Sequence, residues 1–267
     1  MSQKLIAAIL LSLLFGACST HNQFPEPVSE KIPTEQITID QPFYLARSEP
    51  IDSLREIISD ELPGDLIQMK RLYERKDIGF DLQKMELFWK DVKQLQGVFS
   101  IDGVKQWIEA TGFLFEITGK EIYAAELEHI QYVPGYVVAS NGSDEIKSLL
   151  ESYIFTRNND YFHVNLFTNA SVLFEHSMHG HVKITQETDF PLSGNVNMKF
   201  SLNEKRFMEI FVRIPEWAEG ATVTVKNVKY LATPGNYCQI AKSWENNDMV
   251  EIHFPVEKMP GYFTNNN

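Results

Sequence analysis

Five glutamates crowd one short stretch of the chain, and paired carboxylates are a common means of cleaving glycosidic bonds. They are Glu109, Glu116, Glu121, Glu126 and Glu128. In such a pair one carboxyl acts as an acid and the other as a base or nucleophile, at separations of about 5 Å or about 6.5–9.5 Å. Glu121 and Glu128 are seven residues apart, so on a helix they share a face. The sequence places no pair across a pocket, and a solvated helix face explains the same spacing.

A second polar cluster contains imidazoles, which are common metal ligands. His176, His179 and His181 follow Glu175, and His179 and His181 would share one face of a strand. Residues 177–180, however, have the composition of a turn. An exposed polar hairpin tip is the simpler interpretation, with an adventitious metal site as the alternative. The sequence therefore predicts no dedicated metal site.

Three side chains are candidates for contact with a sugar, namely Trp217, Arg213 and Trp107. An exposed indole can stack on a sugar face, and Arg213 can pair with a carboxylate such as Glu187. The alternative for Trp217 is packing at the end of a core strand. Trp107 has helical spacing with Leu114, which equally fits a place in the core.

The two cysteines exclude a disulfide scaffold and a multi-cysteine metal site. Cys18 follows Gly16-Ala17 and an apolar run over residues 5–15, an arrangement that resembles the bacterial lipobox, in which the cysteine is lipidated. We therefore predict a signal peptide over residues 1–17 and a lipid on Cys18, with an ordinary secretory signal as the alternative. Cys238 lies in a predicted strand, where we expect a buried, inert thiol rather than a nucleophile.

The composition narrows the classes of partner. The chain has 267 residues, a net charge of −12 and a hydrophobic share of 43%. That share is ample for a packed core, and the acidic balance argues against nucleic acid as a partner. Membrane contact is expected only through the lipid, because the apolar run is shorter than the ~20 residues that span a bilayer. The expected location is a bacterial cell envelope, in the periplasm or at the outer surface.

The spacing of apolar residues divides the chain into two halves. Between residues 51 and 150 they recur every three or four residues, which predicts short helices, with a break at Leu62-Pro63-Gly64. After residue 159 the period becomes two, which predicts strands. The predicted strands cover residues 162–167, 182–188, 196–202, 207–214, 221–225, 237–240 and 249–254. The predicted fold class is α+β, a helical-hairpin region followed by an antiparallel β-sandwich.

The same patterns give the expected domain boundaries. Residues 18–45 are rich in proline near their start and are expected to form an extended tether between the lipid and the folded part. Helices are expected over residues 46–156, the sandwich over residues 157–260 and a polar tail over residues 261–267.

Five segments of the strand-rich half together resemble a known family. They are residues 161–167 (YFHVNLF), 182–191 (VKITQETDFP), 211–218 (FVRIPEWA), 234–237 (PGNY) and 244–252 (WENNDMVEI). In order and spacing they resemble the β-sandwich that follows the catalytic barrel in β-L-arabinofuranosidase-type enzymes, glycoside hydrolase family 127. Residues 115–120 and 149–154 resemble late helices of that (α/α)6 barrel. The helical half is too short for a complete barrel, so the resemblance implies a partial one.

The resemblance implies a chemistry whose residues this sequence lacks. In that family a cysteine is the nucleophile, further cysteines and a glutamate hold zinc, and another glutamate is the acid and base. The paired cysteines would fall at Asn141-Gly142, and the glutamate and cysteine ligands near Ser100-Ile101-Asp102. Only Asp102 is a possible ligand there. No catalytic residue is therefore transferred, and we expect no zinc cofactor.

These observations predict a glycoside-hydrolase-like envelope lipoprotein that takes part in the degradation or capture of an oligo- or polysaccharide. If hydrolysis survives, a carboxylate pair in the helical half must carry it. One alternative is a carbohydrate-binding or scaffolding lipoprotein without catalysis. Another is a decayed fragment that exposes apolar surface, which a second copy or a partner chain would cover.

Overall fold

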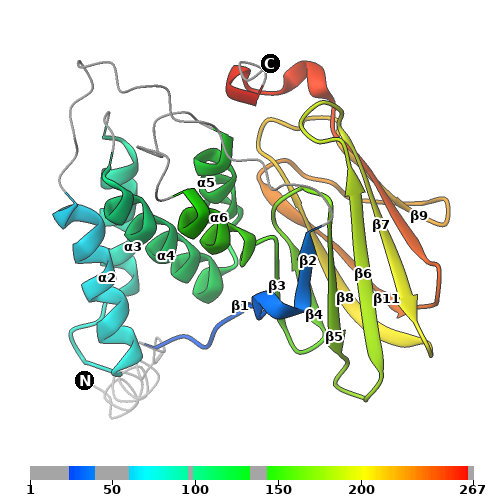
Figure 1. Ribbon diagram of the computed structural model, residues 1–267, viewed down its shortest axis with the longest axis horizontal. Helices are drawn as coiled ribbons and strands as arrows, with labels where there is room; N and C mark the ends of the chain where they lie inside the picture. Colours follow the sequence, from blue (N-terminus) through cyan, green and yellow to red (C-terminus); the bar gives the residue numbers. More distant parts are fainter. Residues whose placement is uncertain (1–23, 40–59, 96–98, 133–142, 264–267) are drawn as a thin grey trace, which may run out of the picture.

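The computed structural model describes residues 24–39, 60–95, 99–132 and 143–263. It confirms the α+β class, with helices on one side and two β-sheets on the other (Figure 1). The described helices are α2 (Glu61–Glu74), α3 (Leu82–Lys93), α4 (Ile101–Thr118), α5 (Glu121–Tyr132), α6 (Ser143–Glu151) and the short η1 (Thr34–Gln36), η2 (Val256–Lys258) and η3 (Gly261–Phe263). None of them has the length and apolar character needed to cross a membrane.

Two sheets contain the described strands. One has the order β1-β3-β4-β8-β11 and the other β10-β9-β12-β7-β6-β5-β2. The strands are β1 (Glu30–Lys31), β2 (Ile37–Ile39), β3 (Phe155–Asn158), β4 (Tyr161–Val164), β5 (Ala170–Glu175), β6 (His181–Thr188), β7 (Asn195–Leu202), β8 (Arg206–Ile214), β9 (Thr222–Val225), β10 (Val228–Tyr230), β11 (Asn236–Trp244) and β12 (Met249–His253).

Helix α4 is the centre of the helical half, because it contacts α2, α5 and α6. The Ser100 hydroxyl caps its first turn by accepting a hydrogen bond from the Gly103 N–H at 3.2 Å. The helix ends at Gly119, whose φ of 64° is a left-handed conformation that glycine adopts without strain. The chain then turns directly into α5, which packs against α4.

The predicted helix break at Leu62-Pro63-Gly64 is wrong, because these residues lie in the first turn of α2. The N–H groups of a first turn have no carbonyl partner within the helix, so a proline costs no hydrogen bond there. Pro63 therefore begins a helix rather than ending one. The helix expected over residues 51–58 lies outside the described residues.

Aromatic rings from the two sheets meet between them. Phe200 of β7 stacks on Trp244 of β11 with 3.9 Å between ring centroids, and Phe162 of β4 stacks on Phe174 of β5 at 5.5 Å. Buried and exposed residues alternate along β6 and β7, as the period of two predicts. These rings fill the space between the sheets.

The sheets differ from the predictions in two ways. Strands β4 and β8 pair in parallel, so the strands are not all antiparallel as predicted. Strand β3 pairs with β4, so the boundary predicted at residue 157 falls inside a hairpin of the sandwich. Both differences depend on which strands pair with each other. A local pattern of alternating residues predicts a strand but not its partner.

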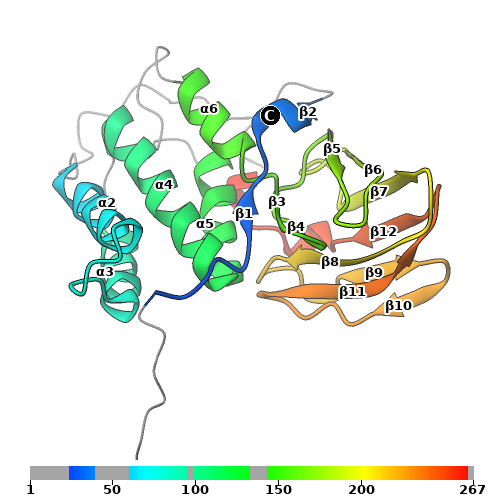
Figure 2. The same cartoon turned by 90° about the horizontal axis from the view of Figure 1, so that it is seen from below.

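Residues 24–39 are not a free tether, although they fall in the segment predicted as one. They supply β1 to one sheet and β2 to the other, and β1 runs between the helices and the sandwich (Figure 2). Ile32, between the two strands, is buried. Strands of two and three residues are too short to show an alternation of apolar and polar residues. The proline content of this segment therefore predicted an extended tether instead.

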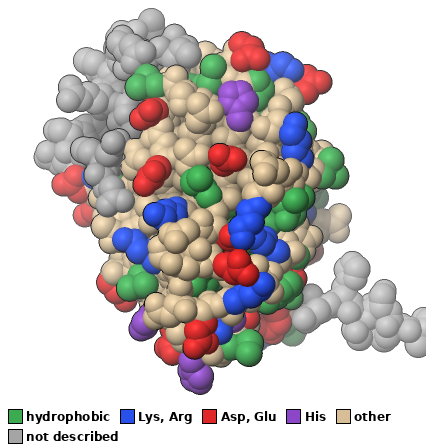
Figure 3. All heavy atoms as spheres, turned by 90° about the vertical axis from the view of Figure 1, so that its right-hand side faces the viewer, with side chains coloured by type: hydrophobic (Ala, Val, Ile, Leu, Met, Phe, Trp, Pro, Cys, Tyr) green, Lys and Arg blue, Asp and Glu red, His purple; other side chains and the backbone are tan. Residues whose placement is uncertain are grey.

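One outer face of the sheets carries side chains of both charges. Figure 3 shows acidic and basic side chains interspersed on the face of the sandwich turned away from the helices, with hydrophobic side chains scattered among them. Scattered exposed apolar residues are normal for a folded protein. At the C-terminal end Phe263 is buried with its ring 4.8 Å from that of Tyr132, so the start of the predicted polar tail packs on the core. Residues 264–267 lie outside the described part.

Candidate functional site

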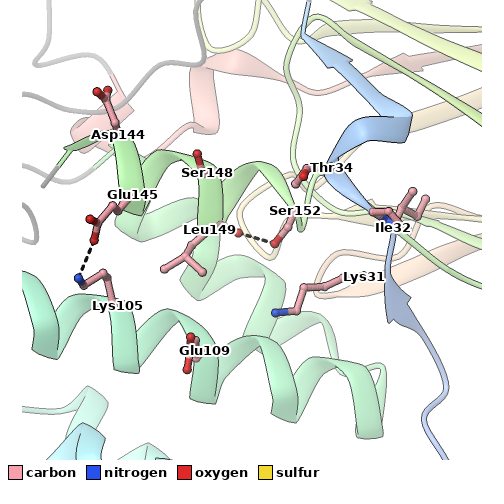
Figure 4. Close-up of a pocket in the computed structure, with 11 residues that line it drawn as sticks. Lys31, Ile32, Thr34, Lys105, Glu109, Asp144, Glu145, Ser148, Leu149 and Ser152 are labelled. Carbon is pink, nitrogen blue, oxygen red and sulfur yellow. Dashed lines mark hydrogen bonds and ion pairs between the residues drawn. The ribbon is translucent and has the colours of Figure 1, made fainter.

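A cleft of about 790 Å³ lies between α4, α6 and the segment of β1 and η1 (Figure 4). In this view Leu149 points from α6 toward α4, and Lys31 extends into the space from β1. Glu109 of α4 also lines the cleft. The Ser152 hydroxyl donates a hydrogen bond to the Leu149 carbonyl at 2.6 Å, which ties it to the last turn of α6. The cleft therefore combines a mainly apolar surface with side chains of both charges.

One ammonium group joins the two helices at the edge of this cleft. Lys105 Nζ lies 2.9 Å from Asp102 Oδ1 and 2.7 Å from Glu145 Oε2. The two carboxylates occupy the first turns of α4 and α6, where the helix dipole favours negative charge. Hydrogen bonds from Glu145 and Asp102 raise the pKa of Lys105, so it remains charged. The spacing from Asp102 to Lys105 was readable in the sequence as a helical pair, whereas the partner on α6 was not.

The zinc ligands implied by the family resemblance do not fit the residues present. Ser100 is hydrogen-bonded to Asp60, Ile101 has no donor atom, and Asp102 is paired with Lys105. Asn141 and Gly142, where the paired cysteines would fall, lie outside the described residues and carry no thiol. Zinc in proteins is held mainly by thiolate and imidazole ligands. In the described ranges no three His, Cys, Asp or Glu side chains are grouped to hold a metal.

Arg213 of β8 inserts between two glutamates of α5. Its Nη1 lies 3.0 Å from Glu121 Oε1, and its Nη2 bonds to Glu128 Oε1. Its Nε donates to the Asn165 carbonyl at 2.6 Å. Glu121 and Glu128 share a face, as predicted, but the solvated-face interpretation is wrong because both are buried. They join the helices to the sandwich.

This burial corrects the expectations for Arg213. The side chain is 0% exposed and pairs with Glu121 and Glu128 rather than with Glu187, so it is not open to a sugar. Burial disfavours the guanidinium charge, but the two carboxylates outweigh it and raise the pKa of Arg213. Burial also raises the pKa of Glu128, opposed by Arg213 and supported by Glu121.

Trp107 lies in the core rather than at a sugar site. It stacks on Trp89 at 5.4 Å, and its Nε1 donates to Glu126 at 3.0 Å. Glu126 also pairs with Lys93 at 3.0 Å. Burial acts to raise the pKa of Glu126, but His129 and Lys93 outweigh it and hold that pKa below its ordinary value. This glutamate is committed to structural contacts.

The remaining two clustered glutamates, Glu109 and Glu116, both lie on α4 and act electrostatically on Tyr153. Glu116 accepts a hydrogen bond from the Tyr153 hydroxyl at 3.3 Å, and burial raises the pKa of Glu116. Glu109 alone of the five lines the cleft of Figure 4. A matched acid and base is thus not formed by the five glutamates across this cleft.

Trp217 borders a smaller cleft of about 480 Å³, beside Glu216 and His129. Its ring lies nearly parallel to that of Phe190 at 6.4 Å, and its Nε1 is buried without a hydrogen-bond partner. The core alternative therefore describes most of the indole. Because Trp217 is only partly buried, it is the one of the three candidates that a sugar can reach.

The cysteine and histidine candidates among the described residues do not form a reactive or metal-binding site. Cys238 on β11 is 1% exposed, and burial raises its pKa to about 11, so the thiol is protonated and inert at neutral pH. His179 and His181 are exposed around the β5–β6 turn, as the hairpin-tip interpretation predicts. His176 differs, because it is buried with Nε2 3.1 Å from the Phe207 carbonyl oxygen. Cys18 lies outside the described residues.

The comparison with family models locates a similarity in the strand-rich half of the chain. Residues 161–256 match the family model described as β-L-arabinofuranosidase, GH127 middle domain. No match is found among curated proteins. Among solved structures, a glycoside hydrolase is 20% identical with a TM-score of 0.51, covering 58% of this chain and 32% of its own.

Two GH127 structures are similar to the same degree. A β-L-arabinofuranosidase from Geobacillus stearothermophilus is 21% identical with a TM-score of 0.50, covering 58% of this chain and 31% of its own. A GH127 β-arabinofuranosidase is 19% identical with a TM-score of 0.51, covering 60% and 33%. The chain therefore spans about a third of the length of these proteins. At these identities the structures show a shared fold.

Proposed function

From the premise that this chain is a relative of the GH127 β-L-arabinofuranosidases, we propose that it is an envelope lipoprotein that captures polysaccharide without cysteine–zinc hydrolysis. In this proposal the helices correspond to part of an (α/α)6 barrel, and the two sheets form the sandwich that follows it. The activity named for the relatives is not carried over, because the match covers only 31% and 33% of their length.

The observation that carries the proposal is the position of Lys105. Its ammonium bridges Asp102 and Glu145 beside the segments where the resemblance implies zinc ligands. The single positive charge offsets part of the charge of the two carboxylates and occupies the space between them, which disfavours a divalent cation there. Asp102 is also the only ligand type left among residues 100–102. The arrangement supports a helix–helix link in place of a metal.

The glutamates support the same conclusion. Hydrolysis by two carboxylates needs an acid and a base on opposite sides of the scissile bond. Glu121 and Glu128 are bound to Arg213, and Glu126 is bound to Trp107 and Lys93. Using any of them in catalysis would leave a buried partner unpaired. Binding of a saccharide needs only rings and hydrogen-bonding groups, which the clefts supply.

The lipid on Cys18 would hold the folded part close to a membrane. Phe24 already packs against the core, with its ring 6.1 Å from that of Phe80. The chain from Cys18 to residue 24 spans at most about 20 Å when extended. The proposed tether therefore shortens to residues 18–23, and the bound polysaccharide would lie near the envelope surface.

The test compares turnover with binding on the full chain, extracted in a detergent without a sugar headgroup. 4-Nitrophenyl β-L-arabinofuranoside is the substrate, with Zn²⁺ or with a chelator, and arabinotetraose is titrated by calorimetry. We expect heat of binding and no release of nitrophenol above the buffer rate in either condition. Zinc-dependent release, or zinc-independent release that survives Cys238→Ala, would contradict the loss of catalysis. Labelling with a fatty-acid analogue that persists in Cys18→Ser would contradict the anchor.

A further inference from the structure

A third cleft, of about 880 Å³, lies on the outer side of the five-stranded sheet. Its other walls are the turn between α4 and α5 and the residues that precede β1. Strands β4, β8 and β11 run side by side at its floor (Figure 2). The sequence motifs did not single out this cleft, because its walls come from three distant parts of the chain.

The strand register collects aromatic rings on the floor of the cleft. His163 of β4 pairs with Phe211 of β8, and Phe211 pairs with Gln239 of β11, so the three side chains form one row across the sheet. The His163 and Phe211 rings stack at 4.6 Å with 12° between their planes. Tyr161 stands two residues before His163 on the same face and is 48% exposed, 6.3 Å from Phe211. Tyr237 closes the group on the side of Arg213.

Side-chain amides stand beside these rings. Gln239 Nε2 donates to Glu209, and Asn236 Nδ2 donates to the Pro234 carbonyl at 3.1 Å. Each amide nitrogen has a second N–H, and each amide has a carbonyl oxygen that accepts two hydrogen bonds. Both residues are exposed in the cleft, so these groups are open to a ligand.

His163 adds an acceptor to the cleft. The Ser29 hydroxyl donates to Thr156 Oγ1 at 2.7 Å and lies 3.2 Å from His163 Nδ1. Because the Ser29 hydrogen is directed to Thr156, the Ser29 oxygen accepts from Nδ1–H. Burial lowers the pKa of His163 to about 4, so the ring is neutral and Nε2 carries the lone pair. A sugar hydroxyl can donate to that nitrogen.

The charged groups of the cleft are largely satisfied within the protein. Lys120 pairs with Glu86, and Glu121 pairs with Arg213. Glu26 remains at the rim as an exposed carboxylate. A lining of rings, amides and one neutral imidazole matches the apolar faces and hydroxyls of an uncharged sugar better than a charged ligand.

We propose that this cleft binds a neutral oligosaccharide, whose sugar faces stack on Tyr161 and Phe211 while its hydroxyls bond to Gln239, Asn236 and His163. The inference rests on the proposed capture function and names the site that performs it. Trp217 lies in a different cleft, so the two sites are separable by mutation.

The test is calorimetric titration of the full chain in a detergent without a sugar headgroup, with arabinotetraose, xylotetraose and cellotetraose as probes. Tyr161→Ala removes the most exposed ring, and Gln239→Ala removes an exposed amide without touching the core. The matched control is Phe207→Ala, which removes an equally exposed ring on β8 that does not line the cleft. Thermal unfolding of each variant checks that it remains folded.

We expect at least one probe to bind, Tyr161→Ala to weaken its binding roughly five- to tenfold, Gln239→Ala to weaken it measurably, and Phe207→Ala to leave it unchanged. Binding that is unchanged in both Tyr161→Ala and Gln239→Ala, or that is lost only in Trp217→Ala, overturns this site but leaves capture intact. Failure of the wild-type chain to bind any of the three probes overturns both this site and the proposed capture function.

Discussion

Arg213 on β8 and Glu121 on α5 are 92 residues apart in the chain, yet Arg213 Nη1 lies 3.0 Å from Glu121 Oε1 in a buried ion pair. The bond crosses the boundary between the sandwich and the helices, and Glu128 extends it to a second carboxylate. The two halves are therefore held in one arrangement by groups that water does not reach.

The first prediction concerns that ion pair. Replacing one partner of a buried pair leaves the other charge unpaired, which costs about 3–5 kcal/mol. Arg213→Met should therefore lower the free energy of unfolding by about that amount in urea denaturation. The control is Lys205→Met, which removes an exposed pair with Glu245 and should cost less than about 1 kcal/mol. Equal shifts of the urea midpoint in Arg213→Met and Lys205→Met would show that the buried ion pair stabilises the fold no more than the exposed one does.

The second prediction concerns two glycines in helices. A Cβ at Gly112 of α4 would lie 2.0 Å from the Tyr153 ring, which is itself buried. Overpacking of this kind costs about 1–3 kcal/mol, so Gly112→Ala should lower the melting temperature. At Gly64 of α2 the nearest atom would be 3.5 Å away, so Gly64→Ala should raise stability by up to about 1 kcal/mol. A Gly112→Ala protein as stable as the wild type would contradict the close packing of α4 on Tyr153.

The third prediction concerns the pH dependence of stability. Burial lowers the pKa of His163 to about 4 from its ordinary value of 6.5. Between pH 6.5 and pH 4 the unfolded chain binds more protons at residue 163 than the folded chain does. The free energy of unfolding is therefore unaffected by His163 above pH 6.5 and falls as the pH drops toward 4. The loss is on the order of 3 kcal/mol. Thermal unfolding from pH 7 to pH 4 measures it.

A variant separates His163 from the other groups that titrate in this range. His163→Phe keeps a ring against Phe211 but cannot take up a proton, so its stability should fall less steeply with acid than that of the wild type. His181→Phe, which removes an exposed histidine, should keep the wild-type slope. The same slope in all three proteins would argue against a buried neutral imidazole at residue 163.

The sequence predicted the elements better than their partners. The stripe that includes Leu66 and Met69 did form a helix, and the period of two did form strands. The prediction at Pro63 was wrong because a proline is compatible with the first turn of a helix but breaks its interior. The local sequence does not reveal which of the two positions a proline occupies. The motif around Arg213 was identified, but its partners on α5 depend on packing between halves far apart in the chain.

The sites were the least predictable part. Lys105 is three residues from Asp102, a readable spacing, but Glu145 joins it only through the packing of α6 on α4. The row of His163, Phe211 and Gln239 is set by strand register, including one parallel pair, and no single segment contains it. Register is fixed by burial over the whole sheet rather than by neighbouring residues.

The most direct test of the central claim is titration of the full chain with Zn²⁺ by calorimetry at neutral pH, in a detergent that does not bind metals. If Lys105 has replaced a metal between α4 and α6, the chain should show no one-to-one binding with a dissociation constant below about 1 µM. One zinc per chain at such an affinity, abolished by Asp102→Ala and retained by Asp144→Ala in the first turn of α6, would contradict the account.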